Sequence, residues 1–432
     1  MARLPPLRAL INLWLPLVPT VSVDRTAPSA GWGDLLRHRR FVLYLATLSV
    51  GDIGYSVYAV AAPWLAYQVT HNFVDVGAVL AAEFGLYAFS FIAAPFVDRA
   101  QEKRIVLLWG YALQAVAASS IGVLAIEQKL TFLLLLPLVS MISLVWDFTW
   151  SANNTIPPLL LPKEALFRAS GLSGVLSGGN QVTGFTVGGA LILLTGPGGA
   201  MLLYGALNAA SAVLALGITT QGSPSAQGPV WQTMVEGWHA WWGGSNGRPL
   251  RSLSLLVAVQ GFFAPGSVLL ITSIASRAAA SQFTYGVLFT AFVLGGAAIG
   301  ILLGHFNPRR HVGLLLLTTP LIAAGLLASA AWAEKVLALG VVLWFASGTA
   351  MLGFEVCYLV YLQATSPPSE VARTTSNVFF FRGTARATGA IALGFVATFL
   401  LPTTLALWIA GGLVVSSVVG AALWPSLRKV QF

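Results

Sequence analysis

Residues 161–195 read LPKEALFRASGLSGVLSGGNQVTGFTVGGALILLT, and residues 367–400 follow the same pattern as PPSEVARTTSNVFFFRGTARATGAIALGFVATFL. Each stretch opens with a proline, a glutamate and an arginine and continues into a glycine-rich apolar run long enough to cross a bilayer. The matching residues lie about 206 positions apart, and a repeat of this kind is typical of transporters built from two bundles. The pattern therefore predicts a chain of two related halves.

The amino-acid composition places both halves in a membrane. Only 9% of the 432 residues are charged, whereas soluble proteins carry roughly 25%. The mean hydropathy is +0.81. In lipid, the backbone N–H and C=O groups must hydrogen-bond within the protein, which leaves helices or a closed β-barrel. Barrel strands alternate apolar and polar residues, whereas the apolar runs here are continuous, so we expect helices. We predict an all-α membrane protein with twelve transmembrane helices in two six-helix bundles related by an internal repeat.

The chain divides into five predicted parts. They are a cytoplasmic N-terminal tail over 1–40, a first bundle over 41–219, a cytoplasmic linker over 220–251, a second bundle over 252–424 and a cytoplasmic tail over 425–432. Four tryptophans in the linker, at 231, 238, 241 and 242, predict a helix lying at the headgroup level. An apolar run behind Arg3 and Arg8 leaves a cleaved signal peptide as an alternative for the first tail.

The net charge of +9 follows the predicted topology and does not indicate nucleic-acid binding. Lysine and arginine gather in the tails and alternate loops, and only Lys129, Arg277 and Lys335 fall in the opposite loops. This positive-inside pattern predicts that both termini are cytoplasmic in a multi-pass protein of the cell (inner) membrane. The single cysteine, Cys357, excludes an internal disulfide.

Several stretches resemble the major facilitator superfamily, especially its bacterial branch of macrolide-efflux proteins and the enterobactin exporter. VGDIGYSVYAVAAPWLAYQVT over 50–70 is similar to that branch's first span, and FVDRAQEKR over 96–104 resembles its cytoplasmic loop motif. The resemblance covers the chain from Phe41 onward. It implies a monomeric multidrug antiporter that works by alternating access and exports drug- or siderophore-like molecules.

The fifth predicted span covers 170–195 and the sixth covers 198–219, and the fifth is rich in glycine. Its pairs Gly174/Gly178 and Gly184/Gly188 have the small-xxx-small spacing that lets helix backbones approach each other, so close packing is expected at both pairs. Exporters of the superfamily carry a proline after the first glycine of the second pair. This chain has Phe185 there, which weakens the inference of an outward direction.

Ionisable side chains within the spans are the candidates for a functional site, because charge in hydrocarbon is costly. Asp52, Glu83 and Asp147 lie near mid-membrane and are candidates for proton coupling, since a desolvated carboxylate can load and release a proton near neutral pH. Asp52 also matches the acid of the resembling first span. Trp146 and Trp150 flank Asp147 and present faces that suit a cationic or aromatic substrate.

The second half contributes Glu355, Arg382 and Arg386 to the predicted substrate cavity. The two arginines share a helix face at i, i+4, and pairing with Glu355 is the structural alternative. By resemblance, a cytoplasmic cluster is expected to gate transport, with plain topological anchoring as its alternative. The members of this gating motif are Asp98, Arg99, Lys103 and Arg104.

Other function classes lack their sequence signals. There is no phosphate-binding loop, no histidine cluster for a metal and no nucleophile elbow, so no cofactor, metal or enzymatic activity is expected. We predict a secondary active transporter that moves small molecules by alternating access, with proton-coupled efflux of lipophilic or amphiphilic compounds. The alternatives are uptake or lipid translocation by the same fold, a non-transporting receptor, and a membrane-embedded enzyme.

Overall fold

A computed structural model describes residues 35, 37–86, 93, 96–97, 99–219, 247–306, 312–332, 336–365 and 371–423, and these ranges contain helices and no strand. The predicted interfacial helix of the linker lies outside them, as do residues 1–34 and 424–432. The helices of the first half are α3 Arg39–Thr70, α4 Phe73–Gly85, α6 Lys103–Ile126, α7 Phe132–Thr155, α8 Pro157–Leu160 and α9 Lys163–Leu216. Those of the second half are α11 Gly247–Phe263, α12 Pro265–Arg277, α13 Ser281–Phe306, α14 Val312–Trp332, α15 Leu337–Thr365, α16 Val371–Phe399 and α17 Pro402–Leu423.

Nine helical segments within these ranges are long and apolar enough to cross a membrane. Three predicted spans are accounted for separately. The helix α9 contains two spans, α4 is the described beginning of the second span, and α16 is long enough but carries Arg382 and Arg386. The predicted fold class, with twelve transmembrane helices in two bundles, is confirmed.

The helix α9 reverses direction at a glycine. Gly196 has φ 74° and ψ 173°, a conformation that L residues rarely adopt, and Pro197 follows it. Proline is favoured in the first turn of a helix because its missing N–H needs no partner there. The residue pair therefore ends one span and begins the next, where the sequence predicted a break between 195 and 198.

The internal repeat is visible in the packing as well as in the sequence. A Cβ on Gly184 of α9 would meet the backbone oxygen of Ile53, and a Cβ on Gly389 of α16 would meet that of Phe262. Each contact joins the fifth span of one half to the first span of the same half. Glycines at matching positions thus make matching backbone contacts, which is the behaviour expected of two copies of one bundle.

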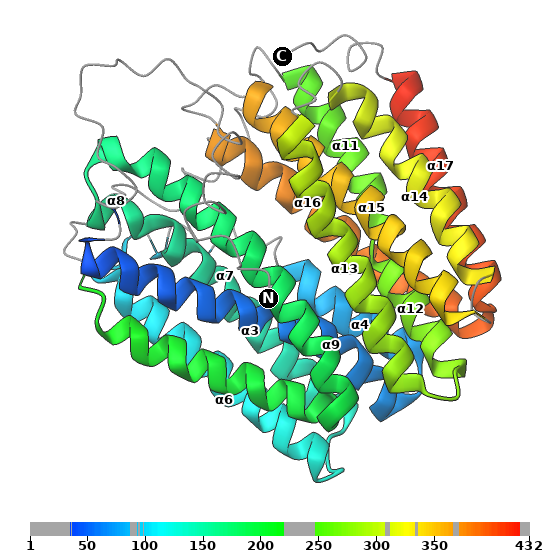
Figure 1. Cartoon of the computed structure of the whole chain (residues 1–432), viewed down its shortest axis with the longest axis horizontal. Helices are drawn as coiled ribbons and strands as arrows, with labels where there is room; N and C mark the ends of the chain where they lie inside the picture. The colour runs from blue at the N-terminus through cyan, green and yellow to red at the C-terminus, as the bar shows by residue number, and fades with distance from the viewer. Residues whose placement is uncertain are drawn as a thin grey trace, which may run out of the picture.

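The two halves form separate groups of helices that meet along two seams. Helices of the first half occupy the left and lower part of Figure 1, and those of the second half the right and upper part. The seams are α4 against α16 and α9 against α13. Each seam joins the second span of one half to the fifth span of the other, so the repeat relates one seam to the other.

The seams are closed on one side of the membrane. We call the side where α3 begins the proximal side and the opposite side the distal side. In the distal half, a Cβ on Gly286 of α13 would lie 2.7 Å from the backbone oxygen of Gly189 on α9. In the related seam, a Cβ on Gly77 of α4 would meet backbone atoms of Ala390 and Gly394 on α16. The backbones therefore touch across both distal seams.

Aromatic side chains add to the distal closure. The rings of Trp64 on α3 and Tyr285 on α13 stack with centroids 4.6 Å apart. The Tyr285 hydroxyl donates a hydrogen bond to the backbone oxygen of Val60 at 3.0 Å. All three residues are buried, so this contact excludes water between the halves.

On the proximal side, no described residue closes the α9–α13 seam at Gly174 or Gly178 of α9. Gly178 is eleven residues before Gly189 and lies on nearly the same face of α9, about three turns lower. It is exposed, and no described atom lies within 4 Å of its Cβ position, nor of the Cβ position of Gly174. The expectation of close packing at Gly174/Gly178 is therefore wrong for this structure, while Gly184/Gly188 do pack against α3.

The hydrophobic core follows the same division. One large cluster contains distal residues of both halves, including Trp64 and Tyr285. Two smaller clusters lie on the proximal side, and each belongs to one half only, around Tyr111 in the first and Tyr358 in the second. Within the described ranges, the apolar core is thus continuous between the bundles distally and divided proximally.

Candidate functional site between the bundles

Asp52 lies in α3 at the face that packs on α9. Its side chain is buried, and its Oδ2 accepts a hydrogen bond from the Ser177 hydroxyl. Ser177 is partly buried and precedes the exposed Gly178 on α9. Sequence reasoning missed Ser177, because a serine in a glycine-rich span carries no signal of its contact with a helix 125 residues away.

A polar network lies beside Asp52 within the first bundle. Tyr111 of α6 packs against the Cα of Gly51, and its hydroxyl accepts a hydrogen bond from Asn153 Nδ2 at 3.1 Å. The Tyr44 hydroxyl donates to the backbone oxygen of Asn153 at 3.0 Å. These contacts tie α3, α6 and α7 together, which is the interhelical use expected of an asparagine inside a span.

Glu83 lies in α4 at the seam with α16. Its side chain is 3% exposed, and the Tyr55 hydroxyl donates to Oε1 at 3.2 Å, while Oε2 has no hydrogen-bond partner among the described residues. Arg386 of the opposite bundle is close enough to interact with it electrostatically. Glu83 is therefore the acidic candidate that stands nearest to the other half.

Asp147 lies in α7 and is enclosed. It is 1% exposed, and neither carboxylate oxygen has a hydrogen-bond partner among the described residues. Trp146 next to it stacks on Tyr55 at 4.1 Å between ring centroids and on the half-exposed Trp150 at 6.3 Å. The predicted aromatic pair is thus present, but one of the two faces of Trp146 is covered by a tyrosine that the sequence did not single out.

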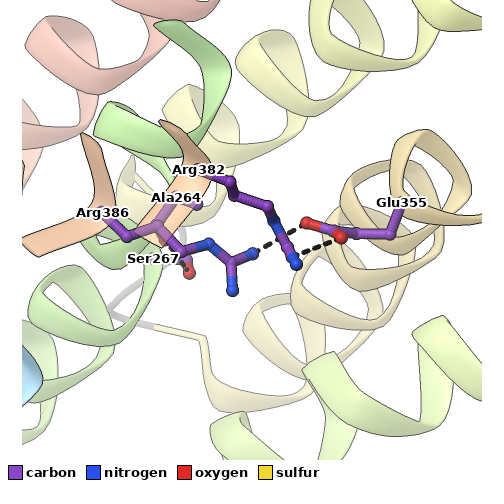
Figure 2. A network of polar contacts seen from close by, with 5 residues as sticks. All are labelled: Ala264, Ser267, Glu355, Arg382 and Arg386. Carbon is purple, nitrogen blue, oxygen red and sulfur yellow. Dashed lines mark hydrogen bonds and ion pairs between the residues drawn. The ribbon is translucent and has the colours of Figure 1, made fainter. Parts of the chain in front are cut away.

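Glu355, Arg382 and Arg386 form a charged triad in the second bundle (Figure 2). Glu355 of α15 pairs through Oε2 with Arg382 and through Oε1 with Arg386 Nη2 at 2.7 Å. The predicted pairing is confirmed, and it involves both arginines at once. The carboxylate bridges two guanidiniums that are one helical turn apart on α16.

Aromatic rings support both arginines. The Arg382 guanidinium carbon lies 5.4 Å from the ring centre of Tyr358, and that of Arg386 lies 5.1 Å from the ring centre of Phe84. Tyr358 belongs to the same bundle, but Phe84 belongs to α4 of the other one. The triad therefore reaches across the seam, a fact that the sequence did not indicate.

The predicted gating motif is described in part. Asp98 lies outside the described residues, and Arg99 is partly buried. The buried Lys103 Nζ donates to the backbone oxygens of Val97 and, at 3.1 Å, Ala100. Both carbonyls belong to the chain just before α6, so the Lys103 ammonium caps the helical residues that precede α6.

Arg104, the last member of the gating motif, lies in the first turn of α6 and pairs with the residue that precedes this helix. Its Nε lies 2.7 Å from Glu102 Oε2. No group of three or more histidine, cysteine, aspartate or glutamate side chains within the described ranges is placed to hold a metal ion.

The acidic and basic groups within the spans are divided between the halves. Asp52, Glu83 and Asp147 belong to the first bundle, whereas Arg382 and Arg386 belong to the second and outnumber their partner Glu355. Among the described residues, the spans of the first bundle thus carry formal negative charge at these positions, and those of the second carry formal positive charge.

Comparison with known proteins identifies the fold. No protein-family model matches the chain, and no curated protein matches its sequence. Among solved structures, the nucleoside transporter NupG is 14% identical with a TM-score of 0.69, over 90% of this chain and 99% of NupG. A bacterial homologue of the human lysosomal transporter Spinster, inward-facing and unoccupied, is 15% identical with a TM-score of 0.64, over 91% of this chain and 95% of the homologue.

A third match comes from another group of transporters. A POT family transporter in complex with a thioalcohol-conjugated peptide is 11% identical with a TM-score of 0.71, over 90% of this chain and 97% of that one. At these identities the likeness establishes the fold and not the substrate. The chain is a multi-pass membrane protein with the fold of these transporters.

Proposed function

We propose that this protein is a secondary active transporter of the inner membrane that works as a monomer by alternating access. In this proposal it exchanges protons for lipophilic or amphiphilic small molecules, which it exports from the cytoplasm. The observation that carries the proposal is the one-sided closure of two repeated bundles around buried acidic side chains. A receptor or scaffold has no need of a seam that closes on one side and opens on the other.

The geometry of the seams supports alternating access. Glycine backbones touch distally at Gly189/Gly286, whereas Gly178 on the same face of α9 meets open space proximally. Rocking one bundle against the other would exchange these conditions without unfolding a helix. With both termini in the cytoplasm, as the positive-inside pattern predicts, the described state opens inward.

Asp52 is proposed as the proton carrier. It is buried, and its hydrogen-bond partner Ser177 is partly buried beside the exposed Gly178, so we expect a proton to reach it from the proximal side. Glu83 accepts a hydrogen bond from Tyr55 and lies near Arg386 of the opposite bundle. We therefore propose that the protonation of Glu83 depends on the position of that bundle. An unpaired carboxylate charge is costly to bury, so we expect a proton or a substrate cation to balance Asp147.

The test is transport in proteoliposomes with an imposed pH gradient and a panel of cationic, neutral and anionic amphiphiles. Asp52→Asn should abolish gradient-driven accumulation while binding and substrate-for-substrate exchange survive, because neither needs the proton to leave. Asp147→Asn should instead weaken affinity, most of all for cationic substrates. Glu127→Gln serves as the matched control, because Glu127 is exposed and pairs with Lys129 in the loop between α6 and α7.

Two outcomes would change the proposal. Normal gradient-driven transport by Asp52→Asn would move the proton site to Asp147 or Glu83. If all three neutralised variants still respond to the pH gradient, proton coupling is refuted. Reversing the gradient in the same vesicles tests direction, since uptake or lipid translocation by the same fold is the alternative to export.

A further inference from the structure

We propose that Arg382 and Arg386 form a binding site for the anionic group of an amphiphilic organic molecule, a carboxylate, sulfonate or phosphate. Glu355 occupies the position of that anion when the site is empty. The inference rests on the proposed transport function and adds a substrate class to it. The expected ligand joins one negative group to an aromatic or aliphatic body.

The geometry of the triad is the first argument. Each oxygen of Glu355 is held by one arginine, so the two guanidiniums are spaced to hold one carboxylate group between them. An incoming anion in the place of Glu355 can be held bidentately by the same guanidinium forks.

Access is the second argument. The side chains of Arg382, Arg386 and Glu355 are 19%, 20% and 15% exposed, whereas Asp147 and Glu83 are buried. The triad is therefore more exposed than these two acids of the first bundle.

The surroundings of the arginines are the third argument. The rings of Tyr358 and Phe84 lie against the two guanidiniums and limit their rotation. Both rings are apolar surfaces next to the anion position, so they suit the body of an aryl or alkyl acid. Because Phe84 comes from the first bundle, a ligand at this site would contact both halves.

Among the described residues, Glu83 is a further ionisable group near the site. It lies near Arg386 but takes its hydrogen bond from Tyr55, so it contributes charge without filling the position between the arginines. When Glu83 is ionised the cluster is neutral, and when it is protonated the cluster carries one positive charge. Anion binding should therefore be stronger when Glu83 holds a proton.

A purely structural role for the triad makes a different prediction. If Glu355 only locks α15 to α16, Glu355→Gln should destabilise the protein and leave anion binding as weak as before. If Glu355 stands in for a ligand, the same change removes a competitor and should tighten anion binding about tenfold, in line with a charge-assisted hydrogen bond.

The experiment measures equilibrium binding to the purified full-length protein in nanodiscs of zwitterionic lipid, by calorimetry and without a pH gradient. The probes are 1-naphthaleneacetate and its neutral analogue 1-naphthaleneacetamide, which differ only in the charged group. The wild type should bind the acetate at least tenfold more tightly than the amide. Arg382→Gln and Arg386→Gln should each remove most of this preference, and Glu83→Gln should increase it.

Arg277→Gln is the matched control, since Arg277 is exposed at the end of α12, and it should change nothing. Equal binding of acetate and amide by the wild type would overturn the proposal, and so would a folded Glu355→Gln variant without a gain. If Glu355→Gln fails to fold, Arg386→Lys decides. It should keep acetate binding within tenfold of the wild type, and a loss as large as that of Arg386→Gln would refute the site.

The same measurement separates two sources of the anion and two possible failures. Competition by added phosphatidylglycerol would assign the site to a lipid headgroup, and its absence would assign it to a solute. Because no gradient is applied, the anion preference can be observed even if the protein does not couple transport to protons. Conversely, if the protein shows no anion preference, it can still be a proton-coupled transporter of neutral or cationic compounds.

Discussion

Replacing Gly286 with alanine should shift the protein away from its distally closed state. The added Cβ would lie 2.7 Å from the backbone oxygen of Gly189, and this oxygen belongs to a helix backbone that cannot rotate aside. Restoring an ordinary contact of about 3.4 Å requires α9 and α13 to separate by about 0.7 Å at this point. The repeat-related Gly77→Ala should act in the same direction.

The cost of such overpacking is about 1–3 kcal/mol. Alanine also improves helix propensity by about 1 kcal/mol, but it does so in both conformations and cancels. The distally closed state alone bears the clash, so the equilibrium between the two conformations should move by a factor of about 5–150.

Distances between spin labels can measure this shift directly. Cys357 is the single cysteine, so a Cys357→Ala background accepts labels at Val175 of α9 and Leu302 of α13. These side chains are 42% and 45% exposed and lie on the proximal halves of the two helices. The wild type should show mainly the long distance of the open proximal seam, and Gly286→Ala should enlarge a population at shorter distance.

Gly411→Ala is the control for this experiment. Gly411 is exposed on α17, and no described atom lies within 4 Å of its Cβ position, so the distance distribution should not change. An unchanged distribution in Gly286→Ala would refute the argument that glycine contacts hold the distal seam. A shift of equal size in Gly411→Ala would show that the label pair reports something other than the seam.

Three further predictions test topology, gating and the cost of the buried acid. A reporter fused after Phe432 should be cytoplasmic and one inserted at 127–129 should be outside, and the reverse result would contradict the positive-inside assignment. Asp98→Asn should slow transport while substrate binding stays largely intact, and wild-type rates would reduce the motif to topological anchoring. Asp147→Leu should raise the free energy of unfolding by about 1–3 kcal/mol, because it removes two buried oxygens that lack described partners, while transport is impaired. Asp52→Leu should instead lower thermal stability, because Asp52 accepts a hydrogen bond from Ser177, and equal changes in both variants would contradict this distinction.

Span positions were predictable to within a few residues. The break at Gly196 and Pro197 was expected between 195 and 198, and α3 begins at Arg39 where Phe41 was expected. Helix α11 begins at Gly247, inside the segment assigned to the linker. The helix extends beyond the end of the apolar run, because the polar residues next to that run can also be helical. Hydropathy marks where lipid begins and not where a helix ends.

The candidate site was predictable in its ionisable residues and not in their partners. A charged residue in an apolar span is visible in the sequence because the cost of burying it makes it rare. The tyrosines and the serine that surround the acids are ordinary residues in such spans. Tyr55 on Glu83, Ser177 on Asp52 and Phe84 beneath Arg386 acquire their roles only through contacts between distant helices.

The sequence by itself determined that this chain is a helical membrane protein of two repeated halves, and which acids and arginines lie within its spans. These are local properties, since the transfer of each side chain from water to lipid depends on little beyond that side chain and its neighbours along the chain. Only the tertiary structure decided which side of the seams is closed. It also decided that Glu355 bridges both arginines, and that Phe84 of the other half lies against Arg386. The same glycine spacing occurs at Gly174/Gly178 and at Gly184/Gly188, yet among the described residues only the second pair is packed against a neighbour. Contact depends on the relative position of whole bundles, and that position is a balance among many surfaces far apart in the chain.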